Sequence, residues 1–550
     1  MDTTQPRMRW WGWGEDGHDG PVKPGAKKML TKVCGWPKGV HRPPADLENI
    51  DLPESTLPAG ARTRFEAVLG DEYIRDDHAT RVSHAAGRSV PDLIRLRTGK
   101  LPFAPDAVLY PASDTEVDEL LRICSDERIA VVPFGGGTSV VGGIEAFRPD
   151  FHSCVCISLA RLGEVIDIDE ESLTATVQAG VFGPALEEKL QAEGFTLGHF
   201  PQSFEFSTVG GWVATRSAGQ QSTGYGRIDA NVLGLRASTP SGPIELRSTP
   251  ASAAGPNPRQ VLVGSEGTLG IITQATLSIT RLPEATLPDA WFFPDFHSGA
   301  TALREMEQNG LRPDIARLSD INETAFGLAQ LGSDLQRKGL QAYLKARGVT
   351  TPCLMVLRFD GLKAEARSRR AEGRTIAKRH KGVTIGGAPE TQWEKHRFST
   401  PYLRDQLLTE GVVVDTMETA APWSSIEDLH AEIGSRIEAT MAARGTPAFV
   451  LCHVSHLYSS GCSLYYTVFA RQEIGTELAQ WKALKTAASE AIVAGGGTIT
   501  HHHGTGADHA PWLPEETGEL WLKMLRAAKA EVDPAGVMNP GKLMNGPRAL

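Results

Sequence analysis

Three consecutive histidines, His501, His502 and His503, are the residues of this 550-residue sequence that most directly indicate chemistry. Imidazole exchanges a proton near neutral pH, so one or two of these side chains can act as a general acid or base. A metal site needs a further convergent ligand, and neither an HExxH nor a CxxC pattern supplies one, so we expect no metal. Residues 498–500 have the pattern of a strand, which predicts that successive imidazoles point to opposite faces.

A glycine-rich segment, PFGGGTSVVGG at residues 133–143, predicts a site for a phosphate-bearing ligand. Glycine adopts positive φ and has no Cβ, so such a loop can direct several backbone N–H groups to one point. Convergent N–H groups bind anions, and the hydroxyls of Thr138 and Ser139 add donors suited to a diphosphate. The segment lacks the Gly-Lys-Ser/Thr ending of a Walker loop, and no helical pattern follows it as in a Rossmann fingerprint. A flexible glycine turn is the alternative interpretation.

Two later segments have a related composition. Residues 198–226 carry several hydroxyls separated by small residues, which suits a backbone that lies against a large flat ligand. Residues 263–272 place glycines every three residues just before a β-rich run. We therefore expect all three segments to contribute to one ligand site.

The elements that must position these segments can be predicted from local patterns. Residues 113–124 open with a capping box, Ser113 and Glu116, and continue with apolar residues at helical spacing, so we expect a helix. The apolar run at residues 129–132 predicts a buried strand that leads directly into the first glycine-rich segment. A second helix is expected over residues 182–193, because a glycine suited to a helix C-terminus follows it.

Composition excludes several function classes. A net charge of −10 argues against a general nucleic-acid surface, and 41% hydrophobic residues predict two or three domains with a large core. The seven cysteines have no regular spacing, which indicates reduced, buried thiols in a cytoplasmic protein. Residues 1–30 contain no apolar signal-peptide core, and no apolar run of about 18 residues occurs, so we expect neither secretion nor a membrane span.

Three further segments are not part of the predicted ligand site. Residues 9–14, RWWGWG, hold three indoles, and because exposed tryptophan is costly we expect this arm to dock on the main body, with surface binding as the alternative. Residues 328–349 mix leucines with basic residues, which suits either peripheral contact with an anionic membrane surface or an ordinary solvated helix. Residues 424–445 form an amphipathic helix pattern whose apolar stripe we expect in a core.

The three glycine-rich segments, in this order and spacing, resemble the FAD-binding domain of the vanillyl-alcohol oxidase superfamily. Together with RWWGWG, ETAAPW at 418–423 and HHHGTG at 501–506, they resemble the alkyldihydroxyacetonephosphate synthase family within it. The resemblance covers about residues 8–512 and implies an α+β fold: a two-part FAD-binding domain of the vanillyl-alcohol oxidase type with an inserted α+β cap domain. The implied parts are an N-terminal arm and helical region (1–95), the FAD-binding domain (96–286), the cap or substrate domain (287–494) and a C-terminal segment that returns to the flavin site (495–550).

The resemblance also implies roles for individual residues. It places His502, His503 and His199 in the active site, Arg317 near the flavin and Arg404 on a substrate phosphate. A guanidinium suits that last role because its planar donor fork binds a phosphate bidentately. We expect the FAD to be non-covalent, because these segments lack a cysteine and the resemblance assigns their one histidine, His199, to another role. The implied cofactor contacts are Pro133, Gly135, Gly136, Gly137, Thr138, Ser139, Pro201, Ser207, Thr208, Gly210, Gly211, Ala214, Thr215, Ser217, Ala218, Gly219, Tyr225, Glu266, Gly267, Gly270, Ile271 and Ile272.

The sequence departs from the family pattern at the family's catalytic tyrosine. Gapless placement of the strand-like residues 461–469 puts Leu464 at that position. Tyr465 replaces it if the register shifts by one residue, whereas Tyr466 shares the face of Leu464 but lies two residues along. The ending at residues 533–544 resembles that of the 2-hydroxy-acid dehydrogenases of the same superfamily. These differences keep the flavoprotein prediction and leave the substrate open.

Two functions follow. In the first, the acyl group of acyl-dihydroxyacetone phosphate is exchanged for a fatty alcohol through an adduct at flavin N5, a reaction of ether lipid synthesis. In the second, the flavin oxidises a 2-hydroxy acid or another hydroxylated anion, with a histidine as base and Arg404 holding the anion. A flavin carrier without catalysis is disfavoured, because storage needs no histidine cluster. The expected partners are a small-molecule or lipid substrate and a second copy of the chain in a homodimer, with no nucleic acid.

Overall fold

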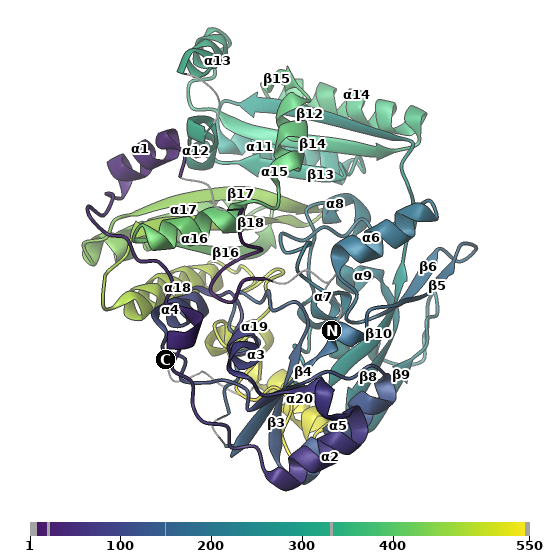
Figure 1. Cartoon of the computed structure of the whole chain (residues 1–550). Coiled ribbons are helices and arrows are strands. Elements are labelled where there is room, and N and C mark those ends of the chain that lie inside the picture. The colour runs from purple at the N-terminus through teal and green to yellow at the C-terminus, as the bar shows by residue number, and fades with distance from the viewer. Residues whose placement is uncertain (1–7, 19–21, 149, 331–333, 545–550) are drawn as a thin grey trace.

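The structure is a computed structural model that describes residues 8–18, 22–148, 150–330 and 334–544. Figure 1 shows a lower part that holds the N-terminal sheets and an upper part built on one large sheet. The yellow C-terminal helices, α19 (Leu513–Thr517) and α20 (Glu519–Val532), lie back in the lower part beside N-terminal elements. The C-terminal segment also bridges to the first sheet, where Met538 pairs with Val131. The mixture of helices and sheets confirms the predicted α+β class.

The lower part contains a small mixed sheet and a five-stranded antiparallel sheet. The small sheet has the order β1-β2-β4-β3, in which β2, β4 and β3 are parallel, and the larger sheet has the order β5-β6-β10-β8-β9. The strands are β1 (Ile74–Arg75), β2 (Ala107–Leu109), β3 (Ile129–Phe134), β4 (Ser153–Ser158), β5 (Val165–Asp169), β6 (Thr174–Gln178), β7 (Phe195–Thr196), β8 (Val232–Thr239), β9 (Gly242–Leu246), β10 (Ile271–Ser278) and β11 (Thr280–Arg281). The helices are α2 (Ala59–Leu69), α3 (His78–Ser83), α4 (Val90–Thr98), α5 (Asp114–Asp126), α6 (Gly183–Ala192), α7 (Val209–Thr215), α8 (Ser222–Tyr225), α9 (Ile228–Asn231) and α10 (Arg259–Leu262).

The upper part is built on a seven-stranded antiparallel sheet of order β15-β12-β14-β13-β17-β18-β16. Helices α11, α14 and α17 pack on it, α18 packs on α17, and the main apolar cluster of the chain lies among these helices and the strands. The strands are β12 (Ala285–Phe293), β13 (Ile315–Ser319), β14 (Cys353–Gly361), β15 (Val383–Gly386), β16 (Val412–Pro422), β17 (Ala448–Tyr458) and β18 (Gly461–Arg471). The helices are α11 (Phe296–Gln308), α12 (Ile321–Gln330), α13 (Asp334–Ala346), α14 (Lys363–Arg379), α15 (Ala388–His396), α16 (Thr400–Thr409), α17 (Ile426–Ala443) and α18 (Glu477–Ala494).

Several local predictions are confirmed. The N-cap Ser113 of α5 accepts from the N–H of Glu116, while the Glu116 carboxylate reaches back one residue further than a standard capping box, to the N–H of Ala112. Gly194 follows α6 with a φ of +83°, as its predicted role at a helix end requires. The apolar stripe of α17 is buried in the cap core, and all seven cysteines are buried free thiols. The proposed boundaries between domains stay a prediction.

The predicted strand at residues 498–500 is wrong. Residues 498–503 contain bends and no strand, although the N–H of Thr498 donates to the carbonyl oxygen of Ala420 on β16 (3.0 Å). The N–H of Ile499 is bonded to Glu516, and the N–H groups of the three histidines are bonded to Glu418. The imidazoles therefore do not alternate between two faces of a sheet.

The N-terminal arm docks on the main body, as expected from its indoles. Trp13 is buried, and the Arg88 guanidinium donates to the carbonyl oxygens of Gly12 (2.8 Å) and Arg9 (3.0 Å). At the far end of the cap, α13 carries a strongly exposed Leu335, and residues 331–333 before it lie outside the described part. Among the helices of the described ranges, none combines the length and apolar character needed to cross a bilayer.

Candidate functional site

A cavity of about 350 Å³ lies between the glycine-rich segments and the cap sheet. Every cofactor contact implied by the sequence lines this cavity, with the exception of Tyr225. The Tyr225 hydroxyl instead donates to Asp360 of the cap strand β14 (3.1 Å). The three segments therefore meet around one space, and Tyr225 joins the two parts of the chain beside it.

The first two segments contact each other through their backbones, which explains the glycines. A Cβ at Gly136 would overlap with the carbonyl oxygen of Phe206, and a Cβ at Gly135 would overlap with the Thr208 hydroxyl. Gly137 has a φ of +72°, where a side chain is strained. The cradle that results presents backbone N–H groups and hydroxyls to the cavity, a donor set that fits the diphosphate of FAD.

The third segment ties the histidines to this cradle. The buried Glu266 accepts from the N–H groups of Thr505 and Gly506, each at 2.6 Å. Asn539 of the C-terminal segment donates to the carbonyl oxygens of Glu266 (2.7 Å) and Gly143 (3.0 Å). Burial raises the pKa of Glu266 to about 7, although the two N–H donors oppose this shift. The chain beyond the cap is therefore bonded directly to the predicted flavin segments.

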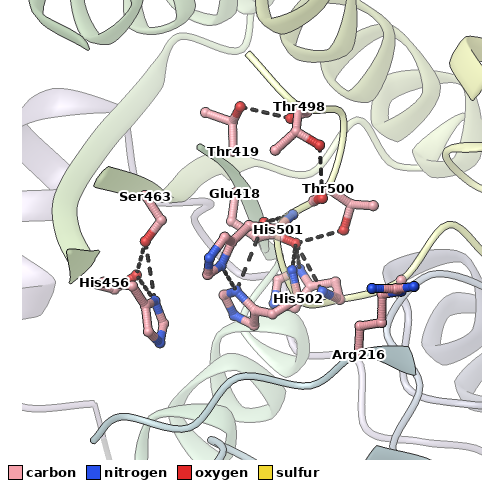
Figure 2. Close-up of polar contacts among 12 residues, drawn as sticks. Arg216, Glu418, Thr419, His456, Ser463, Thr498, Thr500, His501 and His502 are labelled. Atoms are coloured by element: carbon pink, nitrogen blue, oxygen red, sulfur yellow. Dashed lines mark hydrogen bonds and ion pairs between the residues drawn. The ribbon is translucent and has the colours of Figure 1, made fainter. Parts of the chain in front are cut away.

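The fully buried carboxylate of Glu418, on β16, organises the three histidines, and Figure 2 shows it at the centre of their contacts. It accepts from the backbone N–H groups of His501, His502 (3.2 Å) and His503 (2.9 Å), and from the Thr500 hydroxyl (2.8 Å). Burial alone would raise the pKa of Glu418, but the three imidazoles and the N–H donors hold it well below 4.5. A fixed negative charge therefore lies beside the histidines.

The imidazoles themselves are neutral at physiological pH. Burial lowers the pKa of His502 to about 3 and that of His501 well below 6.5, and the Glu418 charge only partly opposes this. The Nδ1 atoms of His501 and His502 share a hydrogen bond of 2.9 Å, and His502 and His503 both line the cavity. A neutral imidazole next to a buried carboxylate can accept a proton, because the carboxylate stabilises the imidazolium that forms.

A third imidazole, which the sequence did not indicate, completes the cluster. His456 on β17 has a ring nitrogen within 4.8 Å of nitrogens of His501 and His502, so the premise that no third ligand converges is corrected. Both nitrogens of His456 are engaged, however: Nε2 donates to the carbonyl oxygen of Gly219 (2.9 Å), and Nδ1 accepts from hydroxyls, such as that of Ser455 (2.8 Å). The described contacts hold His456 by hydrogen bonds, so we assign no metal.

The cap sheet brings Tyr465 to the histidines. Tyr465 on β18 pairs across the strands with Glu418 on one side and His453 on the other, so these side chains share one face. Its ring stacks on His453 (centroids 5.0 Å apart) and lies 5.9 Å from the ring of His502. Tyr465 therefore lines the cavity together with the imidazoles.

Tyr466 points the opposite way and is fully buried in the cap core, as is Leu464. The Tyr466 hydroxyl donates to the carbonyl oxygen of His430 (3.4 Å). The candidate role of Tyr466 is corrected, because its face of β18 is turned away from the cavity. Adjacent strand residues face opposite sides, so only one of the two tyrosines can reach the histidines.

His199 also differs from the implied role. It is buried behind the cavity wall, its Nε2 shares a hydrogen bond with the Ser217 hydroxyl (3.1 Å), and its ring lies against Trp212. Burial lowers the pKa of His199 to about 3. Because Ser217 lines the cavity and His199 does not, this histidine supports the flavin segment from behind.

Both predicted arginines line the cavity. Arg317 on β13 forms an ion pair with Glu323, whose carboxylate also lies 2.9 Å from Nδ1 of His453. Arg404 on α16 donates from Nη1 to the carbonyl oxygen of Arg88 (2.9 Å). Its Nη2 is buried and has no hydrogen-bond partner in the described part of the chain. Arg404 therefore has an unused donor next to the cavity, which suits an anionic ligand.

The docked N-terminal arm reaches the residue next to Arg404. The N–H of Trp13 donates to the buried Asp405 carboxylate (2.5 Å), and the Arg9 guanidinium lies 3.5 Å from the same oxygen. Trp13 also lines the cavity. The arm therefore contributes to the wall of the site and fixes the helix that carries Arg404.

Sequence reasoning missed Glu418, His453, His456 and Asp405. A signal was present for Glu418, since it is, with Asp415, one of two carboxylates in the mostly apolar run that forms β16. His453 and His456 also lie in a buried strand, where an ionisable side chain requires a partner. Their partners come from distant parts of the chain, which no local pattern reveals.

Two family models match the chain: an FAD binding domain over residues 105–246 and the C-terminal domain of FAD linked oxidases over residues 282–543. Alkyldihydroxyacetonephosphate synthase of Dictyostelium discoideum is 33% identical over 512 residues, which cover 91% of this chain and 83% of the relative. A solved structure of an alkyldihydroxyacetonephosphate synthase, 29% identical, has a TM-score of 0.85 and covers 99% of both chains. The structure of p-cresol methylhydroxylase, 16% identical, has a TM-score of 0.67 over 90% of this chain and 98% of that one.

These matches confirm the fold of the vanillyl-alcohol oxidase type and FAD as the cofactor. The site geometry agrees with them, because the cradle of glycines and hydroxyls adjoins a cluster of proton-exchanging side chains. The protein is an FAD-dependent enzyme. By its similarity over almost the whole chain, it belongs to the alkyldihydroxyacetonephosphate synthase family.

Proposed function

We propose that this enzyme exchanges the acyl group of acyl-dihydroxyacetone phosphate for a fatty alcohol, a reaction of ether lipid synthesis. The observation that carries the proposal is the unpartnered Nη2 donor of Arg404, a residue that lines the cavity together with His502, His503 and Tyr465. A phosphate needs a fixed cation, and an alcohol needs a base. The cavity supplies both.

In this reaction, Arg404 binds the substrate phosphate and orients the acyl-bearing carbon. Neutral His502 or His503 accepts the proton of the fatty alcohol, and the Glu418 charge stabilises the imidazolium that results. The fatty acid leaves as a carboxylate at neutral pH, so each turnover releases one proton in total. Arg317 and Tyr465 line the same wall and complete the proposed site. The bound FAD, held non-covalently by the cradle, would supply the electrophile for the exchange.

The test uses the anaerobic holoenzyme with palmitoyl-dihydroxyacetone phosphate, and measures flavin absorbance and released palmitate together. We expect the flavin absorbance to bleach as palmitate is released, and to recover when hexadecanol is added with formation of the ether product. Complete flavin reduction without palmitate would overturn the proposal and indicate oxidation of a hydroxylated anion instead. Unchanged absorbance with no palmitate would exclude this substrate.

We also propose that the protein is a cytoplasmic homodimer that contacts membrane surfaces peripherally through α13. Support for the contact comes from Leu335, which is 80% exposed on a helix that also carries Lys338 and Lys345. Sedimentation with vesicles of anionic and of neutral lipid tests it, with Leu335→Glu as the matched variant. Equal sedimentation of both proteins, or of neither, would remove α13 from the proposal. Light scattering in solution tests the homodimer, because it measures the molar mass of the particle.

A further inference from the structure

A second cavity lies beside the histidine cluster. It has a volume of about 500 Å³, and its wall includes Arg227, Tyr458, His501, His502 and the partly exposed Trp521. His502 lines both this cavity and the flavin cavity, whereas His501 and Tyr458 line the second one. The histidine segment is therefore the partition between the two spaces.

A continuous row of hydrogen bonds crosses this partition. Nδ1 of His502 and Nδ1 of His501 are 2.9 Å apart, and Nε2 of His501 lies 2.5 Å from the Tyr458 hydroxyl. The Tyr458 oxygen also interacts with the Arg227 guanidinium, which forms an ion pair with Asp229. The remaining nitrogen of His502, Nε2, has no hydrogen-bond partner in the described ranges. Both ends of the row thus adjoin a cavity.

We infer that His502, His501 and Tyr458 form a proton path from the active site to the second cavity; this rests on the proposed function. In the resting state, Nδ1–H of His502 donates to Nδ1 of His501, and Nε2–H of His501 donates to the Tyr458 oxygen. This arrangement leaves the lone pair of His502 Nε2 for the alcohol. Tyr458 then donates its own proton to water in the second cavity.

Proton movement along this row is balanced. When His502 takes the alcohol proton at Nε2, its Nδ1 proton passes to His501, the Nε2 proton of His501 passes to Tyr458, and the hydroxyl proton of Tyr458 passes to water. Each member gains and loses one proton, so the released proton leaves without crossing the flavin cavity. The two imidazoles end in the opposite tautomers and must return to the resting ones before the next turnover.

The charges around the row favour this transfer. The Glu418 carboxylate lies 3.9 Å from Nδ1 of His502 and stabilises positive charge at the start, and Arg227 stabilises negative charge on the Tyr458 oxygen at the end. His456, whose ring centroid lies 4.8 Å from that of His501, is held by its own hydrogen bonds and does not interrupt the row.

The variant Tyr458→Phe removes one hydroxyl and keeps the ring. In single turnovers with palmitoyl-dihydroxyacetone phosphate and hexadecanol, a pH indicator dye reports the proton and chromatography reports palmitate. We expect wild-type protein to release both in one phase, and Tyr458→Phe to release the proton roughly 100-fold more slowly, at the lower end of the range that positioned proton transfer contributes. Added imidazole buffer should restore part of the rate, because it can enter the second cavity and take the proton from His501.

The control is Tyr73→Phe, which removes a hydroxyl from a ring that packs against Arg161 and lines neither cavity, and should release the proton at the wild-type rate. Equal rates for wild type and Tyr458→Phe would overturn the proton path. Slow release that imidazole does not rescue would also overturn it, since it would indicate a structural role for the hydroxyl.

A second measurement does not depend on the substrate. Nitrogen-15 spectra of the imidazoles in the resting holoenzyme should show His502 protonated at Nδ1 and His501 protonated at Nε2. The opposite tautomers in wild-type protein would refute the path, whatever reaction the enzyme catalyses. Failure of the proposed function would instead appear as absent palmitate release with the expected tautomers present.

Discussion

Replacing Glu418 by glutamine tests whether this carboxylate supports proton transfer by the histidines. The wild-type oxygens accept from three successive backbone N–H groups and from the Thr500 hydroxyl. Glutamine keeps one acceptor oxygen but turns an NH2 group toward donors. It also removes the negative charge that lies 3.9 Å from Nδ1 of His502 and 3.6 Å from Nδ1 of His503.

The size of the effect follows from that charge. Two unit charges about 4 Å apart interact by about 4 kcal/mol at an effective dielectric constant near 20. This interaction exists only while an imidazole is protonated, so its loss raises the barrier to proton transfer and leaves the neutral resting state almost unchanged. At about 1.4 kcal/mol for each factor of ten, Glu418→Gln should lower kcat by roughly a thousandfold.

The assay is kcat for the acyl-for-alcohol exchange, with flavin content and Tm measured in parallel. The control is Glu516→Gln, because Glu516 accepts from Ile499 (2.9 Å) and Thr498 (2.8 Å) in the same segment but does not contact the imidazoles. Its kcat should stay within a few-fold of wild type. If Glu418→Gln with normal flavin content kept kcat within threefold of wild type, the stabilisation of an imidazolium by this carboxylate would be refuted.

Three further predictions follow from the same site. Arg404→Ala should lower kcat/KM about 10- to 150-fold at normal flavin content, with partial recovery in Arg404→Lys; an unchanged value contradicts phosphate binding. Acid precipitation should leave the flavin in the supernatant, and colour in the pellet would show a covalent link. Burial lowers the pKa of His509 from 6.5 to about 3, so its contribution to stability is lost as pH falls below 6.5. When the pH is lowered from 7.5 to 5.0, the free energy of unfolding should therefore fall by about 2 kcal/mol less in His509→Asn than in wild type, as measured by urea titration.

The flavin cradle could be predicted from the sequence because its cause is local. Gly135 and Gly136 lie where a side chain would overlap with the second segment, and Gly137 adopts positive φ. Such backbone requirements leave a direct trace in the sequence, as glycines between hydroxyl residues. Tyr225 was the exception, because its hydroxyl is bonded to Asp360 of the cap and its neighbours in sequence do not reveal that contact.

The histidine segment could not be predicted in the same way. Its alternation of residue types resembles a strand, yet its conformation is set by Glu418, which lies 83 residues before His501. A buried carboxylate that accepts several backbone N–H groups outweighs a weak strand preference, since leaving its charge without partners would be costly. The convergence of His456 likewise depends on how β17 packs against that segment.

The choice between Tyr465 and Tyr466 could not be made from the local sequence pattern. Strand alternation established that only one of them could reach the histidines, but the face is decided by the pairing of β16, β17 and β18. That pairing sets Tyr465 between Glu418 and His453, so the proposed acid–base residues of the cap lie in one row across the strands. A change of register by one residue would turn Tyr465 toward the core face, away from Glu418 and His453.

The cavity is assembled from parts that are far apart in the chain, and this separates flavin binding from catalysis. The cradle belongs to the lower sheets, Arg404 to α16, Tyr465 to the cap sheet and the histidines to the C-terminal segment. The N-terminal arm fixes α16 through Asp405, and Glu266 fixes the C-terminal segment to the cradle. A change in the arm or at Asp405 should therefore alter how Arg404 meets an anion while the flavin stays bound, whereas a change at Glu266 should disturb the flavin and the histidines together.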